Sequence, residues 1–589
     1  MRSGAVALLL VIVALGGCTT GRDGISSWDA DRAFAKLAEE FTKGYLKWRP
    51  AAGTSLGLHE YDGRITGLSK NSIDSEVTRL KEFEQALAEL QGTGLSAANR
   101  YDLRILQATI RSELFRLVDM DAYHKNPMTY ADVIDVNIYI KRNFAPLENR
   151  VRSIIAIERQ APKVIAAARA NLQESLAKPY VETAMQVAKG AADFLRKDLT
   201  EALRELPDEK LEAEFKEAND RAIAELEGYA EYLKAEKLPR AHDNYAVGRD
   251  AYRRMLAAEF IDLTPEQLLE VGMKELRREQ EIFADTAGKI DATKKPIEVA
   301  KLIQRDHPTA ENLIRDTAKN LEAIRQLCVE KKIITILSTV RARVDETPQY
   351  LRATSFASMD TPGPFERKAT EAYYYVTPVE PEWTPEQKEE WLGAFNYYTT
   401  DIVSIHEAYP GHYTQFLCLN ASPATRVQKI FTSYAFVEGW AHYTEQMLLD
   451  EGFGATELKT QEDLERAAKY RLAQSIEALL RLCRMCVSIK THCEGMSLDA
   501  ATQFFEQNCY YEQKPARQEA LRGTYDPGYL YYTVGKLQIL KLREDWRKQE
   551  GRKYSLQRFH DELLRHGAPP IVLLREKMLK DRKIRGEVF

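Results

Sequence analysis

Apolar residues recur at three- and four-residue spacing along most of this chain, which is the period of helices that bury one face. Glycine and proline are sparse between breaks, as long packed helices require. In the first part of the chain the period is clearest over residues 29–41, 75–90, 97–118, 147–175 and 181–232. A Leu-Pro pair at 238–239 then interrupts it. We therefore predict an N-terminal helical lobe over residues 28–240, with its charged faces in solvent.

The second part, residues 241–589, is predicted to form another lobe that also begins with helices. Thr264 followed by Pro265 is typical of a helix start, because threonine caps the first turn and proline fits its first position. Further helical periods cover residues 264–287, 312–330, 460–494 and a stretch that starts at 383.

Two stretches in this part are rich in β-branched or aromatic residues and lack the helical period, namely residues 332–345 and 372–378. They predict strands of a small sheet. The predicted fold is therefore mainly α and two-lobed, with a small β-sheet just ahead of residues 401–415. The exposed edge of such a sheet can pair with an extended peptide. The alternative is a structural sheet without a substrate role.

The size and composition of the chain indicate a globular protein with more than one lobe. The chain has 589 residues, which exceeds one ordinary hydrophobic core. Hydrophobic residues make up 44% and charged residues 29%, a balance typical of globular proteins, and the formal net charge is only -5. Because no basic domain or basic run is present, we expect no nucleic-acid partner.

The first residues have the pattern of an export signal. A short positive segment is followed by an apolar run at residues 5–15, which is too short to span a bilayer. The next residues, Leu15-Gly-Gly-Cys18, resemble a bacterial lipobox. This resemblance implies a signal peptide at 1–17, lipidation of Cys18 and a tether at 18–27, so that a lipid anchor holds the protein to a membrane. An ordinary secretory signal with an incidental cysteine is the alternative.

The two residues after the cysteine bear on the location. Thr19 and Thr20 follow Cys18 and no aspartate stands next to it. The resemblance to sorted lipoproteins therefore favours the outer membrane, with the protein facing the periplasm.

The candidate chemistry lies in residues 401–415, where His406, Glu407 and His412 stand close together. Two imidazoles and a neighbouring carboxylate are the parts of a hydrolytic zinc site, usually spaced His-Glu-x-x-His on one helix face. Here the second histidine is six residues after the first, roughly 240° around a regular helix, so the rings would not converge. Pro410-Gly411 predicts a local helix bulge that returns His412 to the face of His406. The alternative is a helix that ends at Tyr409, with two unrelated histidines.

A third ligand is predicted at Glu438, in residues 436–445. Its neighbours are apolar or aromatic, and a carboxylate in such a run should be paired or bound to metal. Two histidines and one glutamate with an open position are a known zinc arrangement. His442 lies one helical turn further on the same face, so we predict that it supports the site from behind. The alternative for Glu438 is a solvated helix carboxylate.

A rival metal site comprises Cys483, Cys486, His492 and Cys493. It is the weaker hypothesis, because a zinc knuckle needs a tight turn between its cysteines and this segment is helical. Buried free thiols explain the cysteines better, and a disulfide is the alternative in an oxidising compartment.

The motifs His-Glu-x-x-Pro-Gly-His at 406–412 and Val-Glu-Gly-Trp-Ala at 437–441 closely resemble those of the bacterial domain of unknown function 885. That family is grouped with gluzincin-like metallopeptidases. Residues 51–64 resemble its opening motif and residues 526–537 its closing Tyr-x-x-Gly-x-Leu helix. The resemblance implies a metallopeptidase-like helical fold with one Zn²⁺ per chain, held by His406, His412 and Glu438, and hydrolysis of short peptides.

The resemblance also supplies candidates for the group that stabilises the oxyanion. Tyr532 matches the Tyr-x-x-Gly position and ranks first, followed by Tyr529 and His492. Around His492 the family normally carries aspartate where Ser488 stands, so this segment departs from the family pattern. For each tyrosine, a core residue with a satisfied hydroxyl is the alternative.

The predicted mechanism follows the usual zinc hydrolase scheme, with Glu407 as the base that takes a proton from water and passes it to the leaving amine. Two other functions remain open. One is a non-catalytic exported lipoprotein that binds peptides or a partner, although such a protein has no need of Glu407. The other is a zinc amidase that acts on a non-peptide amide.

Overall fold

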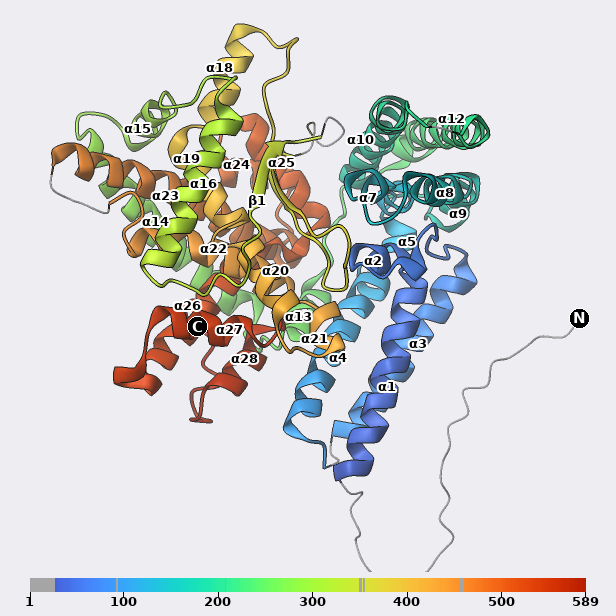
Figure 1. Ribbon diagram of the computed structural model, residues 1–589, viewed down its shortest axis with the longest axis horizontal. Coiled ribbons are helices and arrows are strands. Elements are labelled where there is room, and N and C mark those ends of the chain that lie inside the picture. The colour runs from blue at the N-terminus through green and yellow to red at the C-terminus, as the bar shows by residue number, and fades with distance from the viewer. Residues whose placement is uncertain (1–26, 92–93, 207, 349–351, 353–354, 456–459) are drawn as a thin grey trace, which may run out of the picture.

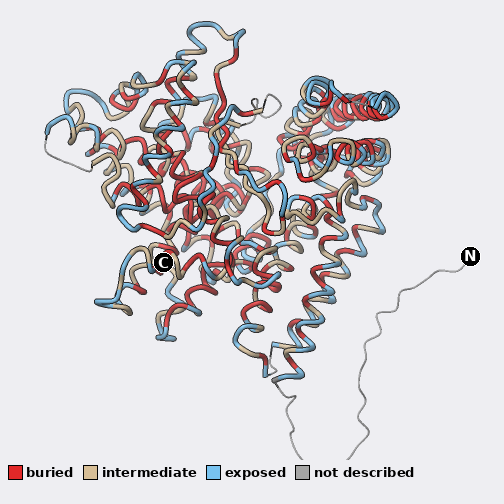
Figure 2. Tube along the Cα trace, in the orientation of Figure 1, coloured by how far each residue is buried: buried red, intermediate tan, exposed pale blue. Residues whose placement is uncertain are grey.

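A computed structural model describes residues 27–91, 94–206, 208–348, 352, 355–455 and 460–589 (Figure 1). The predicted fold class is confirmed: the chain is mainly helical, with one small sheet. Buried positions lie along the inner faces of the helices and exposed positions around the outside (Figure 2). In the described part of the chain, none of the helices combines the length and the apolar character that crossing a membrane would require.

The N-terminal part consists of helices that pack side by side (Figure 1). The predicted period at 147–175 is divided between α8 (Leu147–Glu158) and α9 (Ala161–Asn171), and that at 181–232 among α10 (Lys178–Phe194), α11 (Thr200–Ala202) and α12 (Glu209–Tyr232). The helices are α1 (Ser27–Trp48), α2 (Pro50–Ser55), α3 (Lys70–Gln91), α4 (Ala97–Leu114) with its π-helical extension η2 (Phe115–Asp119), α5 (Ala122–Lys125), α6 (Met128–Ala131), α7 (Asn137–Lys141), α8 (Leu147–Glu158), α9 (Ala161–Asn171), α10 (Lys178–Phe194), α11 (Thr200–Ala202) and α12 (Glu209–Tyr232).

The C-terminal part contains the longest helices. Thr264 caps α14 in a full capping box with Gln267, as the Thr-Pro pair predicts. The helices are α13 (Arg249–Ala258), α14 (Pro265–Ile290), α15 (Pro296–Ile303), α16 (Leu313–Glu330), α18 (Pro385–Ala394), α19 (Tyr397–Glu407), α20 (His412–Ala421), α21 (Arg426–Ile430), α22 (Tyr434–Asp450), α23 (Gln461–Glu494), α24 (Leu498–Asn508), α25 (Gln513–Tyr525), η7 (Pro527–Leu530), α26 (Tyr531–Glu550), α27 (Leu556–Leu564) and α28 (Ile571–Met578).

The small sheet has three strands in the order β1-β3-β2. They are β1 (Ala342–Glu346), β2 (Ala357–Asp360) and β3 (Ala372–Val376). β3 was predicted, but the strand predicted at 332–345 is wrong over most of its length, because only its last residues belong to β1. β2 was missed because its Ala-Ser-Met-Asp sequence has no β-branched residue. β1 pairs parallel and β2 antiparallel to β3.

The sheet lies against the helix that carries the candidate site, as predicted. The Ser404 hydroxyl of α19 donates to the Tyr374 hydroxyl of β3 over 3.2 Å. From the other side, the N-terminal lobe holds the β2–β3 hairpin at its turn end. Arg142 donates to Asp360 in β2 over 2.8 Å and to the carbonyls of Ala369 and Glu371 before β3. The sheet is thus fixed between the two lobes.

Most buried apolar side chains fall into two large groups. One draws almost entirely on residues up to Leu233, and the other on residues from Leu276 onward. A smaller group around Tyr252, Met485 and Leu530 lies between them. Because Val427, Phe431 and Leu573 join the N-terminal group, the two lobes share apolar surface.

Helices α22 and α26 approach each other closely through two glycines. A Cβ at Gly439 would lie 2.5 Å from the Gly535 backbone, and a Cβ at Gly535 would lie 1.8 Å from the Ala435 carbonyl oxygen. These distances leave no room for any side chain. The Glu-Gly-Trp motif and the Tyr-x-x-Gly motif therefore meet at one helix crossing.

We predict that Gly535→Ala lowers the free energy of unfolding by about 1–3 kcal/mol or more, because the added methyl forces α22 and α26 apart. Gly228→Ala is the matched control, since Gly228 lies in α12 and a Cβ there meets nothing within 4 Å. The control should gain roughly 0.5–1 kcal/mol from helix propensity. Urea denaturation of both variants measures the difference; equal stabilities would show that the crossing tolerates a side chain.

Candidate metal centre

The stretch that carries the two histidines is a broken helix rather than a bulged one. α19 begins after the Asn396 cap and ends at Glu407, and α20 begins at His412. The intervening turn contains a cis peptide bond between Tyr409 and Pro410. The predicted bulge is therefore wrong, whereas the predicted convergence of His406 and His412 is confirmed: their ring centroids lie 4.9 Å apart.

Gly411 makes this turn possible. A Cβ at that position would lie 1.8 Å from the His406 carbonyl oxygen and 2.4 Å from the Ile405 carbonyl oxygen. Any residue with a side chain would thus push α20 away from the end of α19. The Gly411 amide donates to the Ile405 carbonyl over 3.0 Å, which closes the turn.

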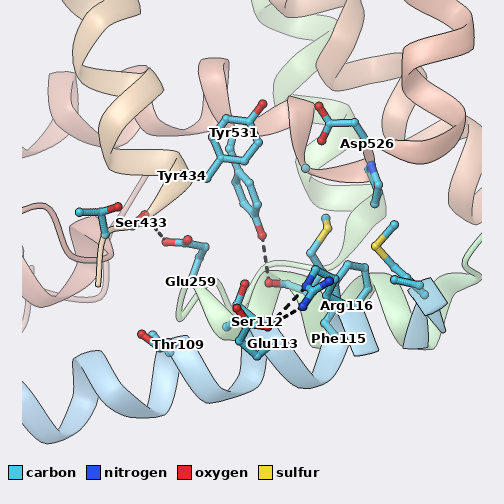
Figure 3. A pocket seen from close by; sticks show the side chains of 18 of the residues that line it. Thr109, Ser112, Glu113, Phe115, Arg116, Glu259, Ser433, Tyr434, Asp526 and Tyr531 are labelled. Atoms are coloured by element: carbon cyan, nitrogen blue, oxygen red, sulfur yellow. Dashed lines mark hydrogen bonds and ion pairs between the residues drawn. The ribbon is translucent and has the colours of Figure 1, made fainter. Parts of the chain in front are cut away.

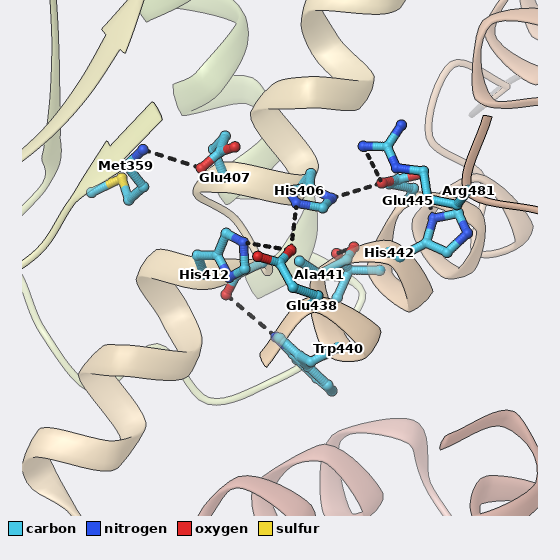
Figure 4. Close-up of polar contacts among 12 residues, drawn as sticks. Met359, His406, Glu407, His412, Glu438, Trp440, Ala441, His442, Glu445 and Arg481 are labelled. Atoms are coloured by element: carbon cyan, nitrogen blue, oxygen red, sulfur yellow. Dashed lines mark hydrogen bonds and ion pairs between the residues drawn. The ribbon is translucent and has the colours of Figure 1, made fainter. Parts of the chain in front are cut away.

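Trp440 holds the same turn from α22. Its indole N–H lies 3.0 Å from the Pro410 carbonyl oxygen and 3.3 Å from the Gly411 carbonyl oxygen, and the side chain is fully buried (Figure 4). Sequence analysis assigned Trp440 no role. Its place two residues after Glu438 could have indicated a role, because a buried indole N–H needs a hydrogen-bond acceptor.

Glu438 of α22 lies close to the two histidines, and we call His406, His412 and Glu438 the metal group. Its Oε2 lies 3.6 Å from His406 Nε2 and 3.5 Å from His412 Nε2. In the described part of the chain, this is the group of His, Cys, Asp and Glu side chains that can hold a metal ion, with donor atoms all within 4.8 Å of one another. The separations are long for hydrogen bonds but match the edge of a zinc tetrahedron, about 3.3 Å for bonds of about 2.0–2.2 Å.

Glu438 Oε2 is buried and has no hydrogen-bond partner among the described residues. A cation at the centre of the three side chains would satisfy a buried carboxylate oxygen that faces two imidazole nitrogens without a hydrogen bond to either. Burial alone would raise the pKa of Glu438, but His412 and His406 hold it well below its ordinary value, so the group is a carboxylate. Two nitrogens and one oxygen are a donor set that suits Zn²⁺.

Glu445, one helical turn after His442, supports the centre from behind. Its carboxylate lies 2.7 Å from His406 Nδ1 and 3.0 Å from His442 Nδ1 (Figure 4). A carboxylate on the far nitrogen of a ligating histidine fixes the ring and leaves Nε2 as the donor to metal. Sequence analysis gave Glu445 no role. Glu445 follows Glu438 by seven residues and therefore lies on the same helix face, which could have indicated its role from sequence.

His442 has a different place from the one predicted. It contacts Glu445 rather than Glu438, so it acts on the centre only through that carboxylate. Burial and nearby Lys536 lower the pKa of His442 to about 3, so the ring is neutral. Burial also opposes a charge on His406, but Glu438 and Glu445 outweigh it and raise the pKa of His406 to about 10. The two carboxylates therefore create a negative potential that favours a cation.

Glu407 lies at the end of α19 and turns toward the sheet. Its Oε2 accepts a hydrogen bond from the Met359 N–H of β2 over 3.1 Å (Figure 4). The side chain is half-buried. The candidate base is thus oriented by the backbone of the strand at the edge of the sheet.

Tyr532 is half-buried among cations. The guanidinium carbons of Arg481, Arg484 and Arg522 lie 5.8, 5.2 and 5.9 Å from the centre of its ring. Arg481 also lies 3.9 Å from Glu445, which links this cluster to the metal group. Tyr434, one turn ahead of Glu438, packs edge-on against the Tyr532 ring.

The other two oxyanion candidates lie in the core. His492 is buried, its Nδ1 accepts from the Val247 N–H and its Nε2 donates to the Gly523 carbonyl over 2.8 Å. Since both ring nitrogens bond to backbone, His492 is corrected from a catalytic candidate to a structural histidine. Tyr529 is fully buried as well. Of these candidates, Tyr532 alone retains partial exposure.

The rival cysteine site is wrong within the described residues. Cys483, Cys486, His492 and Cys493 lie along the continuous helix α23, and they form no donor group that could hold a metal. The described cysteines are free thiols, and all but Cys493 are buried.

The chain matches one protein-family model over most of its length. The family model described as bacterial protein of unknown function (DUF885) matches residues 50–578. The chain belongs to this family. The matched range includes His406, His412 and Glu438. It also includes residues 51–64 and 526–537, whose sequences resemble the opening and closing motifs of the family. No curated protein matches the chain.

Two solved structures share the fold. The chain of a "putative lipoprotein of unknown function" from Shewanella oneidensis is 25% identical, with a TM-score of 0.75 over 93% of this chain and 100% of its own. A "putative lipoprotein" from Colwellia psychrerythraea is 17% identical, with a TM-score of 0.74 over 92% of this chain and 98% of its own. These names agree with an exported lipoprotein. Cys18, the predicted anchor, lies outside the described residues.

We predict that Glu445→Gln lowers zinc affinity by about 10–100-fold, because an amide orients His406 less strongly than a carboxylate. Glu477→Gln is the matched control: Glu477 also pairs with Arg481 but is not bonded to a histidine of the group. Competition with a chelator of known affinity measures both variants. Equal affinities in the two would contradict the supporting role of Glu445.

Proposed function

We propose that this protein is a zinc-dependent hydrolase that acts on short peptides. The observation that carries the proposal is the convergence of His406, His412 and Glu438 around an unsatisfied carboxylate oxygen, with Glu407 next to the first histidine. These three side chains would hold the ion. When bound, zinc would supply Lewis acidity toward a carbonyl and make a nearby water more acidic.

Glu407 is the general base in this proposal. Its position directly after His406 places a carboxylate beside the metal group, and the Met359 N–H fixes one of its oxygens. The other oxygen can take a proton from water and deliver it to the leaving amine. A non-catalytic binding protein would have no use for this second carboxylate.

Tyr532 is the proposed donor to the developing oxyanion. Three guanidinium groups around its ring produce a positive potential that favours negative charge nearby. The close crossing of α22 and α26 at Gly439 and Gly535 sets its position relative to Glu438, because Tyr532 stands one turn ahead of Gly535.

The sheet supports a peptide as the substrate. β2 is an edge strand, and alternate residues of an edge strand direct their N–H and C=O groups away from the sheet. The N–H of Met359 is directed away from the sheet and donates to Glu407. An extended peptide that pairs with this edge would pass beside the candidate base. We also propose that a lipid at Cys18 anchors the protein in the outer membrane, so the peptides would be periplasmic.

We predict that Glu407→Gln lowers kcat/KM by about 10²–10⁴-fold while zinc content stays unchanged. A library of short peptides, tested beside a set of non-peptide amides, provides the assay. Glu390→Gln, which alters an exposed carboxylate on α18, should keep full activity.

Loss of zinc in Glu407→Gln comparable to that in a ligand variant would contradict its role as base. Turnover of the non-peptide amides without turnover of any peptide would instead identify an amidase.

A further inference from the structure

A cavity of about 420 Å³ lies between the two lobes, apart from the metal group. Its walls come from α4 and η2 on one side and from α13, the start of α22 and η7 on the other (Figure 3). The lining combines apolar and charged side chains. The charged ones are Glu113, Arg116, Glu259 and Asp526.

All of these charges except one have an opposite charge beside them. Glu113 lies 2.5 Å from Arg49 and 3.2 Å from Arg116, so two cations surround it. Asp526 lies 3.0 Å from Arg522. Glu259 has no ion-pair partner in the described part of the chain; its carboxylate accepts one hydrogen bond, from the Ser433 hydroxyl over 2.7 Å. The cavity therefore contains one uncompensated acid.

The surroundings of Glu259 strengthen the case for a cation. Glu259 follows the last residue of α13, where the helix dipole disfavours negative charge and favours positive charge. Burial raises the pKa of Glu259 to about 7. A cation in the cavity would stabilise the ionised form of this carboxylate. It would also face the C-terminal end of α13, where the helix dipole favours positive charge.

The rest of the wall suits an apolar body with aromatic contacts. Phe115, Tyr434 and Tyr531 lie around the space (Figure 3). Phe431 and Met255 also line it. Aromatic faces and a methionine sulfur attract both apolar groups and cations. A small hydrated metal ion would gain nothing from such walls.

We propose that this cavity binds a primary ammonium group attached to an apolar body, with Glu259 as the counter-ion. The proposal does not depend on the zinc hydrolase proposal. Two sources share this chemistry: a free organic amine and the lysine side chain of a peptide. The Ser433 hydroxyl that bonds to Glu259 also caps α22, the helix that carries Glu438, so an occupant would lie at the first turn of that helix.

Calorimetric titration with benzylamine and with benzyl alcohol tests the proposal, because the two probes share their shape and differ in charge. At about pH 8 both Glu259 and the amine are charged. The wild-type protein should bind benzylamine at least about tenfold more tightly than benzyl alcohol. Glu259→Gln should abolish this preference, whereas Glu270→Gln, which alters an exposed carboxylate of α14, should keep it.

Equal binding of the two probes by the wild-type protein would overturn the proposal without any variant, and so would a preference that survives in Glu259→Gln. A second pair of probes, Ala-Lys-Ala and Ala-Gln-Ala with both ends blocked, distinguishes the sources. Preference for the lysine peptide supports a peptide ligand. Benzylamine binding without that preference supports a free amine. Because binding is measured, failure of the hydrolase proposal would not alter these outcomes.

Discussion

The candidate site depends on the close approach of two helix ends across the turn at residues 408–411. His406 closes α19 and His412 opens α20, and their rings meet because Gly411 lets the chain reverse with its Cα against the His406 carbonyl. Trp440 ties the turn to α22 by two carbonyl contacts. The same helix supplies Glu438, which is a candidate ligand, and Glu445, which bonds to His406. A shift of α22 would therefore disturb all three at once.

The rest of the protein fixes that helix and the strand opposite it. Gly439 and Gly535 lock α22 onto α26, while Ser433 ties the start of α22 to the carboxylate of Glu259. On the other side of the site, Arg142 of the N-terminal lobe holds the hairpin that contains β2. The opening motif at residues 51–64 contributes to the same contact, since His59 Nε2 lies 3.0 Å from Glu366 Oε2 in the β2–β3 connection. Both lobes thus position the candidate base.

The helices and the three ligand candidates could be predicted from sequence because they follow local rules. Apolar periods mark the long helices, and His406, Glu407, His412 and Glu438 are residue types with specific chemistry in apolar surroundings. The break between α19 and α20 could not be distinguished from a bulge, since both return the second histidine to the first. β2 has no strand propensity and exists because β3 and the N-terminal lobe hold it. His492 stood at a family position, but its backbone hydrogen bonds to Val247 and Gly523 come from segments far away in the chain.

We propose that His406, His412 and Glu438 bind one metal ion. Metal content of the purified mature protein after dialysis against zinc, measured by mass spectrometry beside His412→Ala, tests it most directly. We expect about one zinc per chain in the wild-type protein and little in the variant, because a preformed site that loses one ligand loses most of its affinity. A wild-type protein that retains no zinc, or a variant that retains as much as the wild type, would contradict it.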